Sequence, residues 1–378
     1  MSFDPNVKIG VLGGGQLGRM MIQSAIDLNL NIKSMDPDPN APCKNIVEEF
    51  VNGDIKDYEQ VMAFGADCDL ITVEIENVNI EALEELEKQG KKVFPQPSAL
   101  KIIKDKGIQK QFYLDHDIPT SEFVLTSNLK DLDALTHMLP AVHKLRTEGY
   151  DGRGVQVVRT EKDFTKGFEA PALLEKFIDY RKEISVVVAR NETGQVTTFP
   201  VVELEYHPEA NLVEFLFSPS PLSDEIKTKA KKMAEKVIKA LDMVGLLAVE
   251  MFVTNSDEIV VNECAPRTHN SGHHSIEGNV TSQFEQHIRA ILNLPLGDTS
   301  IVGPAVMIHL LGEDGYSGVA KYQGIDEALA QKGVHIHLYG KKLTKPFRKM
   351  GHVTIVGDDL DKIKTQARSL KESIKIKA

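Results

Sequence analysis

The chain has 378 residues, 42% of them hydrophobic, which suits two or three domains better than one. A formal net charge of −11 and a pI of about 5.6 argue against a nucleic-acid partner, because such a field repels phosphate backbones. The sequence has no signal-peptide pattern and no run of about 18 apolar residues, so we expect no membrane contact, and three scattered cysteines (Cys43, Cys68 and Cys264) indicate a reducing cytoplasm.

The first hundred residues alternate between short apolar runs and helical periodicity. This alternation predicts a parallel sheet with helices on both faces. Strands are expected at 8–12, 31–35, 69–74 and 92–94, and helices at 17–28, 57–65 and 80–89.

A glycine-rich loop follows the first expected strand. Gly13, Gly15 and Gly18 satisfy G-x-G-x-x-G, and Asp36 ends the second strand, as in a dinucleotide-binding fingerprint. Physically, the motif indicates only that backbone N–H groups at a helix N-terminus can hold an anion. A nicotinamide cofactor, another phosphate ligand and a merely structural turn all remain open from this loop alone.

The rest of the chain changes character after residue 97. We expect one long lysine-rich helix over 98–116 and then a β-rich region from about 121. Strands are expected at 141–145, 155–159, 172–177, 183–189, 197–202, 247–254 and 258–263, helices at 225–244 and 282–292, and a C-terminal portion of strands and one helix from 301.

A second glycine loop follows Lys144, which lies in an expected strand. Gly149, Gly152 and Gly154 make this a flexible hairpin loop that could close over phosphates, with Lys144 supplying a point charge. Taken alone, the segment is better explained by an ordinary glycine-rich hairpin with an exposed lysine. No G-x-x-x-x-G-K-[ST] occurs, so a P-loop is excluded.

A hairpin near residue 256 carries two carboxylates. With Ser256 and Asp257 as a two-residue loop, Thr254 faces Ile259 and Glu250 faces Glu263 on a largely apolar face. Facing like charges are destabilising, and a Mg²⁺ ion between them would resolve the conflict. The alternatives are a shifted register, or one glutamate turned to solvent.

Together these features resemble the ATP-grasp ligases, and more narrowly the family of N5-carboxyaminoimidazole ribonucleotide synthetases. The segments that carry the resemblance are GGGQLGRM (13–20), VEIEN (73–77), GYDGRG (149–154), NECAPRTHNSGHH (262–274), TSQFEQHIRAILNLPLG (281–297) and RKMGH (348–352). The resemblance implies an α/β ATP-grasp fold with a Rossmann-like parallel-sheet domain over 1–96. An ATP-grasp domain would follow over 97–300, with a mobile lid at about 121–180, and a small C-terminal domain over 301–378 would complete the substrate site.

The resemblance also implies a reaction. ATP would phosphorylate bicarbonate, and the amine of aminoimidazole ribonucleotide would be carboxylated, with Mg²⁺ required, in a cytoplasmic and typically homodimeric enzyme. A formate-using ATP-grasp ligase and an NAD-dependent oxidoreductase are the alternatives, and a non-catalytic ATP-binding protein is a third.

Site residues follow from the same resemblance. ATP would be held by Lys106, Lys144, Gly149, Tyr150, Asp151, Gly152, Arg153, Gly154, Glu175, Phe177, Ile178, Glu183, Asn262 and Glu263, and Mg²⁺ by Glu250 and Glu263. The ribonucleotide would be held by Gln16, Leu17, Glu74, Glu76, Tyr150, Asp151, Arg267, Lys341, Arg348 and Lys349. The catalytic residues that act on bicarbonate would be Arg267, His269, Asn270 and His273, together with Lys144.

The chain departs from the family pattern at three places. Glu148 stands where the family usually has another glycine, and Lys106 is only consistent in type with a family position that takes Arg or Lys. In the segment 201–215, either Glu203 or His207 could provide a further ATP contact, and the sequence does not choose between them.

Overall fold

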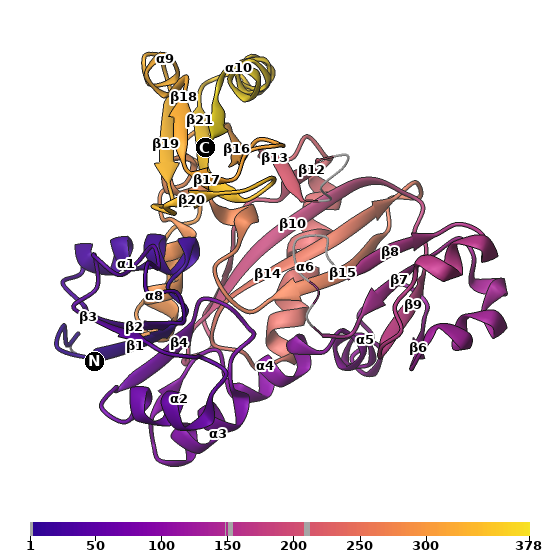
Figure 1. The fold of residues 1–378 in the computed structure, drawn as a ribbon, viewed down its shortest axis with the longest axis horizontal. Coiled ribbons are helices and arrows are strands. Elements are labelled where there is room, and N and C mark those ends of the chain that lie inside the picture. Colours follow the sequence, from indigo (N-terminus) through magenta and orange to yellow (C-terminus); the bar gives the residue numbers. More distant parts are fainter. Residues whose placement is uncertain (1–2, 148, 150–153, 208–211) are drawn as a thin grey trace.

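The computed structural model describes residues 3–147, 149, 154–207 and 212–378, and the predicted α/β class is confirmed. In Figure 1 the N-terminal elements lie at one side, the strands within 123–176 at the other, and the strands of 180–190, 245–254 and 259–265 between them. The C-terminal strands and the last helix lie above the N-terminal part in this view.

The N-terminal sheet is parallel, in the order β3-β2-β1-β4-β5. Its strands are β1 (Lys8–Leu12), β2 (Asn31–Asp36), β3 (Glu49–Asn52), β4 (Leu70–Val73) and β5 (Lys92–Val93). Its helices are α1 (Gln16–Asp27), α2 (Tyr58–Gly65) and α3 (Ile80–Lys88). Asp57 and Asn79 cap α2 and α3 by accepting backbone N–H bonds, which fixes where those helices begin. The sequence missed β3 because that edge strand is partly exposed and has no buried apolar run.

Each face of this sheet is covered by a different set of helices. Val61, Phe64 and Leu83 of α2 and α3 pack on one face. Met21 of α1 packs on the other face together with Phe284 of α8 (Gln283–Ile291), a helix far later in the chain. The N-terminal unit is therefore anchored to the central part by a shared core.

The single helix expected over 98–116 is wrong. The structure has α4 (Pro97–Lys104) and α5 (Lys106–Asp115), separated at Asp105, whose backbone is extended. Asp105 caps α5 by accepting the N–H groups of Gly107 and Ile108, and it also pairs with Arg146 at 2.7 Å. These bonds favour a break over a continuous helix, and the break places Lys106 at the first position of α5.

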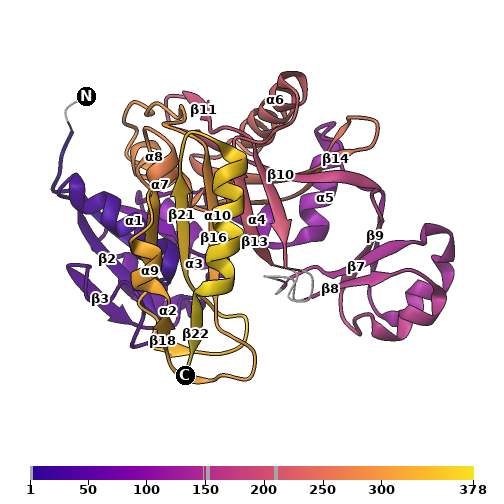
Figure 2. The ribbon, with the colours of Figure 1, turned by 90° about the horizontal axis from the view of Figure 1, so that it is seen from above.

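A separate antiparallel sheet has the order β6-β9-β7-β8. Its strands are β6 (Phe123–Thr126), β7 (Ala141–Leu145), β8 (Val155–Val158) and β9 (Ala172–Lys176). Figure 2 shows this sheet standing apart from the central strands, to which β9 leads through β10 (Tyr180–Arg190).

The largest sheet contains β15-β14-β10-β12-β13-β16-β21-β19, with β11 (Val196–Thr198) also paired to β10. The remaining bounds are β12 (Val202–Tyr206), β13 (Val213–Ser218), β14 (Gly245–Thr254), β15 (Ile259–Ala265), β16 (Ala305–Leu311), β19 (Val334–Leu338) and β21 (Lys349–Val356). The helix α6 (Asp224–Ala240) covers the face built from β10, β14 and β15, and α10 (Leu360–Ser373) packs with β16 and β21.

Two details of this sheet differ from expectation. The strand expected over 197–202 is two strands, β11 and β12, because Pro200 between them has no N–H to donate to the ladder. The C-terminal strands also continue the central sheet through the β13–β16 pairing, so no sheet boundary coincides with residue 301.

Candidate active site

Glu250 of β14 and Glu263 of β15 face each other, as the sequence predicted. The strand register from which this pairing was predicted is wrong. The turn is one residue longer than expected, so that Val253 faces Ile259, and a β-bulge beside Glu250 then shifts the register back by one. As a result, Ile259 and Val261 pack in the core beneath α6 and do not share the face of the two glutamates.

The two carboxylates have opposite electrostatic environments. Lys106 at the start of α5 forms an ion pair with Glu263 and lowers the pKa of that carboxyl group. Burial, reinforced by the charge of Glu263, raises the pKa of Glu250. The pair therefore resists carrying two negative charges unless a further cation joins Lys106.

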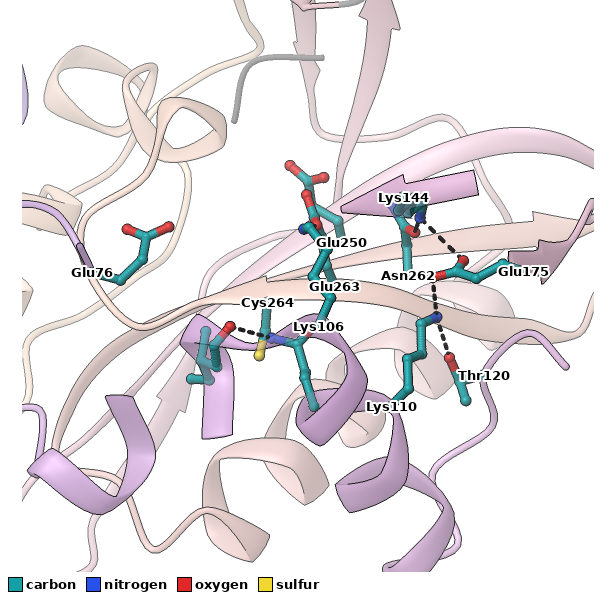
Figure 3. A network of polar contacts seen from close by, with 12 residues as sticks. Glu76, Lys106, Lys110, Thr120, Lys144, Glu175, Glu250, Asn262, Glu263 and Cys264 are labelled. Atoms are coloured by element: carbon teal, nitrogen blue, oxygen red, sulfur yellow. Dashed lines mark hydrogen bonds and ion pairs between the residues drawn. The ribbon is translucent and has the colours of Figure 1, made fainter. Parts of the chain in front are cut away.

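The bulge places Asn262 beside Glu263, both partly exposed, and connects the hairpin to a lysine–glutamate network. The Lys144 ammonium group donates to Asn262 Oδ1 at 3.0 Å and to Glu175 Oε2 at 3.1 Å. Lys110 of α5 approaches the other oxygen of Glu175 at 3.5 Å (Figure 3). Burial would raise the pKa of Glu175, but Lys144 and Lys110 outweigh it and hold the pKa at about 2.

This network changes the role expected for Glu175. Its carboxylate is buried and bonded to Lys144 and to the Ser121 hydroxyl, so the side chain is not open to ATP. Phe177 and Ile178 come directly after β9 and are more exposed than Glu175. Burial raises the pKa of Glu183 on β10 to about 7, and this carboxyl group hydrogen-bonds the Tyr206 hydroxyl.

Arg267 and His269 come from the segment after β15, and His269 lies near Glu250. Arg267 forms a bidentate pair with Glu76, at 2.6 and 3.3 Å, and thereby joins the end of β4 to the central part. His269 Nε2 lies 3.7 Å from Glu250 Oε1. Burial, together with Arg267 and Lys349, lowers the pKa of His269 to about 3, so the ring is neutral.

Asn270 and His273, both predicted to contact bicarbonate, differ in how deeply they are buried. Asn270 is partly exposed, and its Oδ1 atom is buried without a hydrogen bond among the described residues. His273 is fully buried and stacks on His352 with ring centroids 4.8 Å apart. The prediction for His273 is not supported, because its imidazole packs in the core and presents no exposed edge.

The first glycine loop holds a carboxylate of the protein itself. Glu74 accepts the N–H groups of Gly15 at 2.5 Å and Leu17 at 3.1 Å, and Asp36 accepts that of Gly14 at 2.7 Å. A Cβ atom at Gly15 would lie 2.5 Å from Glu74 Oε1. The glycines are therefore needed for a buried glutamate, and the amides of Gly14, Gly15 and Leu17 bond to carboxylates of the protein itself. The Leu17 side chain is likewise buried in the core around α1.

Residues from the C-terminal region reach this loop. The Lys341 ammonium group donates to Gln16 Oε1 at 2.6 Å and to the Lys349 carbonyl at 2.8 Å. Lys349 is buried at the start of β21, whereas Arg348 lies partly exposed and donates to the Leu343 carbonyl at 2.7 Å. Gln16, Lys341 and Lys349 thus come together as predicted, while Arg348 points along a neighbouring turn.

Of the remaining predicted residues, the structure describes some and leaves others outside its described ranges. Glu203 is paired with Lys182, and His207 lies 3.9 Å from Glu214 and against the Phe347 ring. Gly149 and Gly154 are described, with Gly154 at a φ of +72°. Glu148 and the predicted contacts Tyr150, Asp151, Gly152 and Arg153 lie outside the described residues.

Sequence reasoning missed Lys110, whose buried ammonium group also donates to Thr120 Oγ1 at 2.6 Å and Ser121 Oγ at 3.0 Å. Burial lowers the pKa of Lys110 to about 8. One signal was available: Lys106 and Lys110 are four residues apart and share a helix face.

A divalent cation fits the Glu250–Glu263 pair. Two facing carboxylates, of which one resists ionisation, and a neighbouring amide oxygen are hard ligands of the kind that Mg²⁺ prefers. Across the described part of the chain, no group of three or more His, Cys, Asp or Glu side chains is arranged for a metal. Mg²⁺ usually takes only one or two carboxylates and completes its shell with waters and substrate phosphates, so two suffice.

Comparison with known proteins gives matches along nearly the whole chain. Three family models match: a ribonucleotide synthetase preATP-grasp domain at 6–104, an ATP-grasp domain at 111–284, and a phosphoribosylaminoimidazole carboxylase C-terminal domain at 305–366. The N5-carboxyaminoimidazole ribonucleotide synthase of Synechococcus elongatus is 36% identical over 94% of this chain and 91% of that protein. The phosphoribosylaminoimidazole carboxylase of Candida glabrata is 40% identical, and the match spans 92% of this chain but only 63% of that longer protein.

A solved structure agrees with these matches. The N5-carboxyaminoimidazole synthase of Aspergillus clavatus, in complex with ADP and 5-aminoimidazole ribonucleotide, superimposes with a TM-score of 0.89 at 33% identity. That alignment covers 97% of this chain and 98% of the other. Among the described residues, no helix is both long and apolar enough to cross a bilayer.

Proposed function

Because the chain belongs to the N5-carboxyaminoimidazole ribonucleotide synthase family of ATP-grasp ligases, we propose that it carboxylates the amine of 5-aminoimidazole ribonucleotide. Bicarbonate attacks the γ-phosphorus of ATP, which gives carboxyphosphate and ADP. The amine nitrogen then bonds to the carboxyl carbon, directly or through released CO₂, and inorganic phosphate leaves. The observation that carries this proposal is the facing Glu250–Glu263 pair, with Lys106 and Lys144 close by, in a chain with these relatives.

The ATP half of the site is built from cations and oxygen ligands around the bulge. Lys106 and Lys144 bind phosphate oxygens, and Glu250 and Glu263 with Asn262 hold Mg²⁺. When bound there, Mg²⁺ would neutralise negative charge on the phosphate oxygens. Glu183 accepts from a ribose hydroxyl. The backbone of Lys176 to Ile178 reads the adenine, because the Glu175 side chain is already engaged.

Arg267 and His269 hold bicarbonate. The backbone N–H of Ser271 donates to His269 Nδ1 at 3.3 Å, which assigns the ring proton to Nε2. His269 is therefore a neutral donor that faces Glu250, and it stabilises a bicarbonate or carboxyphosphate oxygen. Arg267 supplies the fixed positive charge, and Asn270 adds an amide.

The ribonucleotide lies between the first glycine loop and β21. Gln16, Lys341 and Lys349 form the observed cluster there, and Glu74 and Glu76 border it from the N-terminal sheet. Arg348 would turn from the Leu343 carbonyl to the substrate phosphate, since an arginine fork suits a phosphate. Tyr150 and Asp151 lie outside the described residues and stay in the proposal as substrate contacts implied by the resemblance alone.

The wider expectations belong to the same proposal. They are a cytoplasmic homodimer, division of the chain near residues 96 and 300, and a lid over about 121–180. The proposal of a lid is supported by the four-stranded sheet β6-β9-β7-β8, which is separate from the central sheet and follows into it along the chain from β9 to β10.

The decisive experiment measures ADP release from MgATP with each other substrate omitted in turn. We expect rapid release only when bicarbonate and the ribonucleotide are both present. Release that follows formate in place of bicarbonate would identify a formate-using ligase. Tight MgATP binding with no release under any condition would favour a non-catalytic protein.

A further inference from the structure

Lys110 is a buried lysine to which the proposed mechanism gives no task. Its side chain is 2% exposed. Lysines are almost never buried unless they are paired. Its ammonium group has three neighbours: the hydroxyls of Thr120 and Ser121 and the carboxylate of Glu175.

Glu175 stands between two lysines. Oε1 faces Lys110 at 3.5 Å, and Oε2 accepts from Lys144 at 3.1 Å (Figure 3). The three side chains together carry two positive charges and one negative charge. The net charge of this group is +1, and Lys144 is the member that also bonds to Asn262, the residue before Glu263.

We propose that Lys110 is a positioning residue that neutralises Glu175, so that the charge of Lys144 remains available to an ATP phosphate. Without Lys110, Lys144 would be the sole counter-ion of a buried carboxylate. The pair would then be neutral, and the attraction of Lys144 for phosphate would be largely cancelled. This inference rests on the proposed function, because it assumes that Lys144 binds ATP.

The surroundings of Lys110 fit this task. Thr120 Oγ1 accepts a hydrogen bond from Lys110 and donates one to the Val261 carbonyl at 2.8 Å. Val261 is the residue just before Asn262. Ser121 Oγ donates to Glu175 Oε2 at 3.0 Å. Lys110 therefore links α5, β9 and β15, the three elements that carry Lys106, Glu175 and Glu263. The geometry keeps Glu175 in place while Lys144 changes partners.

The test is a double-mutant cycle in which MgATP affinity is measured by calorimetry. Lys110→Gln keeps a hydrogen-bonding side chain but removes the charge, and we expect it to weaken MgATP binding about tenfold. The double variant Lys110→Gln/Glu175→Gln removes the carboxylate that captures Lys144, and we expect affinity to return to within about threefold of the wild type. Lys110→Met, alone and with Glu175→Gln, replaces Lys110→Gln if the latter does not fold.

A packing role predicts the opposite pattern, because a second buried substitution would weaken binding further. A double variant that binds no better than Lys110→Gln therefore overturns the inference. Lys104→Gln is the matched control: this half-buried lysine donates to the Val78 carbonyl, and its loss should leave MgATP affinity unchanged. If the wild-type chain does not bind MgATP, the proposed function fails. If it binds MgATP and Lys110→Gln binds equally well, only the inference about Lys110 fails.

Discussion

Glu250→Gln should make the metal-free protein more stable while removing most of its activity. Glu250 and Glu263 face each other across β14 and β15, in a position where burial raises the pKa of Glu250. At a spacing of about 5 Å and an effective dielectric constant of about 20, two carboxylates repel by about 3 kcal/mol. Keeping one of them protonated at pH 7 instead costs a similar amount, about 3–4 kcal/mol. Glutamine removes either penalty.

Lys106 offsets part of this repulsion through its ion pair with Glu263. We therefore expect Glu250→Gln to raise the free energy of unfolding by about 1–3 kcal/mol in EDTA at pH 7. Turnover should fall by orders of magnitude because the proposed metal site loses a ligand.

The assay is urea unfolding of the two proteins in EDTA, with Glu258→Gln as the control. Glu258 is exposed at the turn of the same hairpin, so its substitution should change stability by less than about 0.5 kcal/mol. A Glu250→Gln protein that is no more stable than the wild type would refute the reasoning that the carboxylates repel each other in the absence of metal.

Three further substitutions test separate parts of the structure. Glu263→Gln should leave the fold intact but lower turnover by orders of magnitude, and near-wild-type ATP hydrolysis would exclude Glu263 as a metal ligand. Arg348→Ala should raise the KM for the ribonucleotide far more than that for ATP in steady-state assays, whereas equal effects would place Arg348 outside the ribonucleotide pocket. His287→Gln should reduce acid sensitivity. Burial lowers the pKa of His287, which bonds Thr72 at 2.9 Å, to about 4. Below about pH 6.5 the His287 imidazole binds a proton in the unfolded chain but not in the folded chain. The free energy of unfolding therefore falls as the pH drops toward 4. Between pH 7.5 and 5.0 the wild type should lose about 2 kcal/mol more than the variant in urea unfolding, and equal losses would contradict this.

The sequence predicted the N-terminal sheet well because hydrophobic periodicity there coincides with helix caps such as Asp57. It predicted the facing glutamates for a less secure reason. The longer turn and the β-bulge shift the register in opposite directions, so two wrong steps gave the right pair. Such compensation depends on side chains from other elements, including Lys144 on Asn262, and leaves no local pattern.

The glycine loop shows the same limit. Gly15 and its neighbours indicate close approach of an acidic or phosphate oxygen, but only the fold reveals that the oxygen belongs to Glu74, 59 residues away. The break at Asp105 was missed because an aspartate within an otherwise periodic segment can be a cap or an exposed helical residue. Its pairing with Arg146 favours the cap, and that contact is also long-range.

The most direct test of the account is a rapid reaction of MgATP, 5-aminoimidazole ribonucleotide and bicarbonate labelled with ¹³C and ¹⁸O. The account predicts one ¹⁸O atom in each inorganic phosphate, because a bicarbonate oxygen bonds to the γ-phosphorus. It also predicts one ¹³C in a carbamate on the ribonucleotide amine. Unlabelled phosphate, released without any ¹³C-labelled ribonucleotide, would mean that water attacks ATP and that this chain is not a carboxylating ligase.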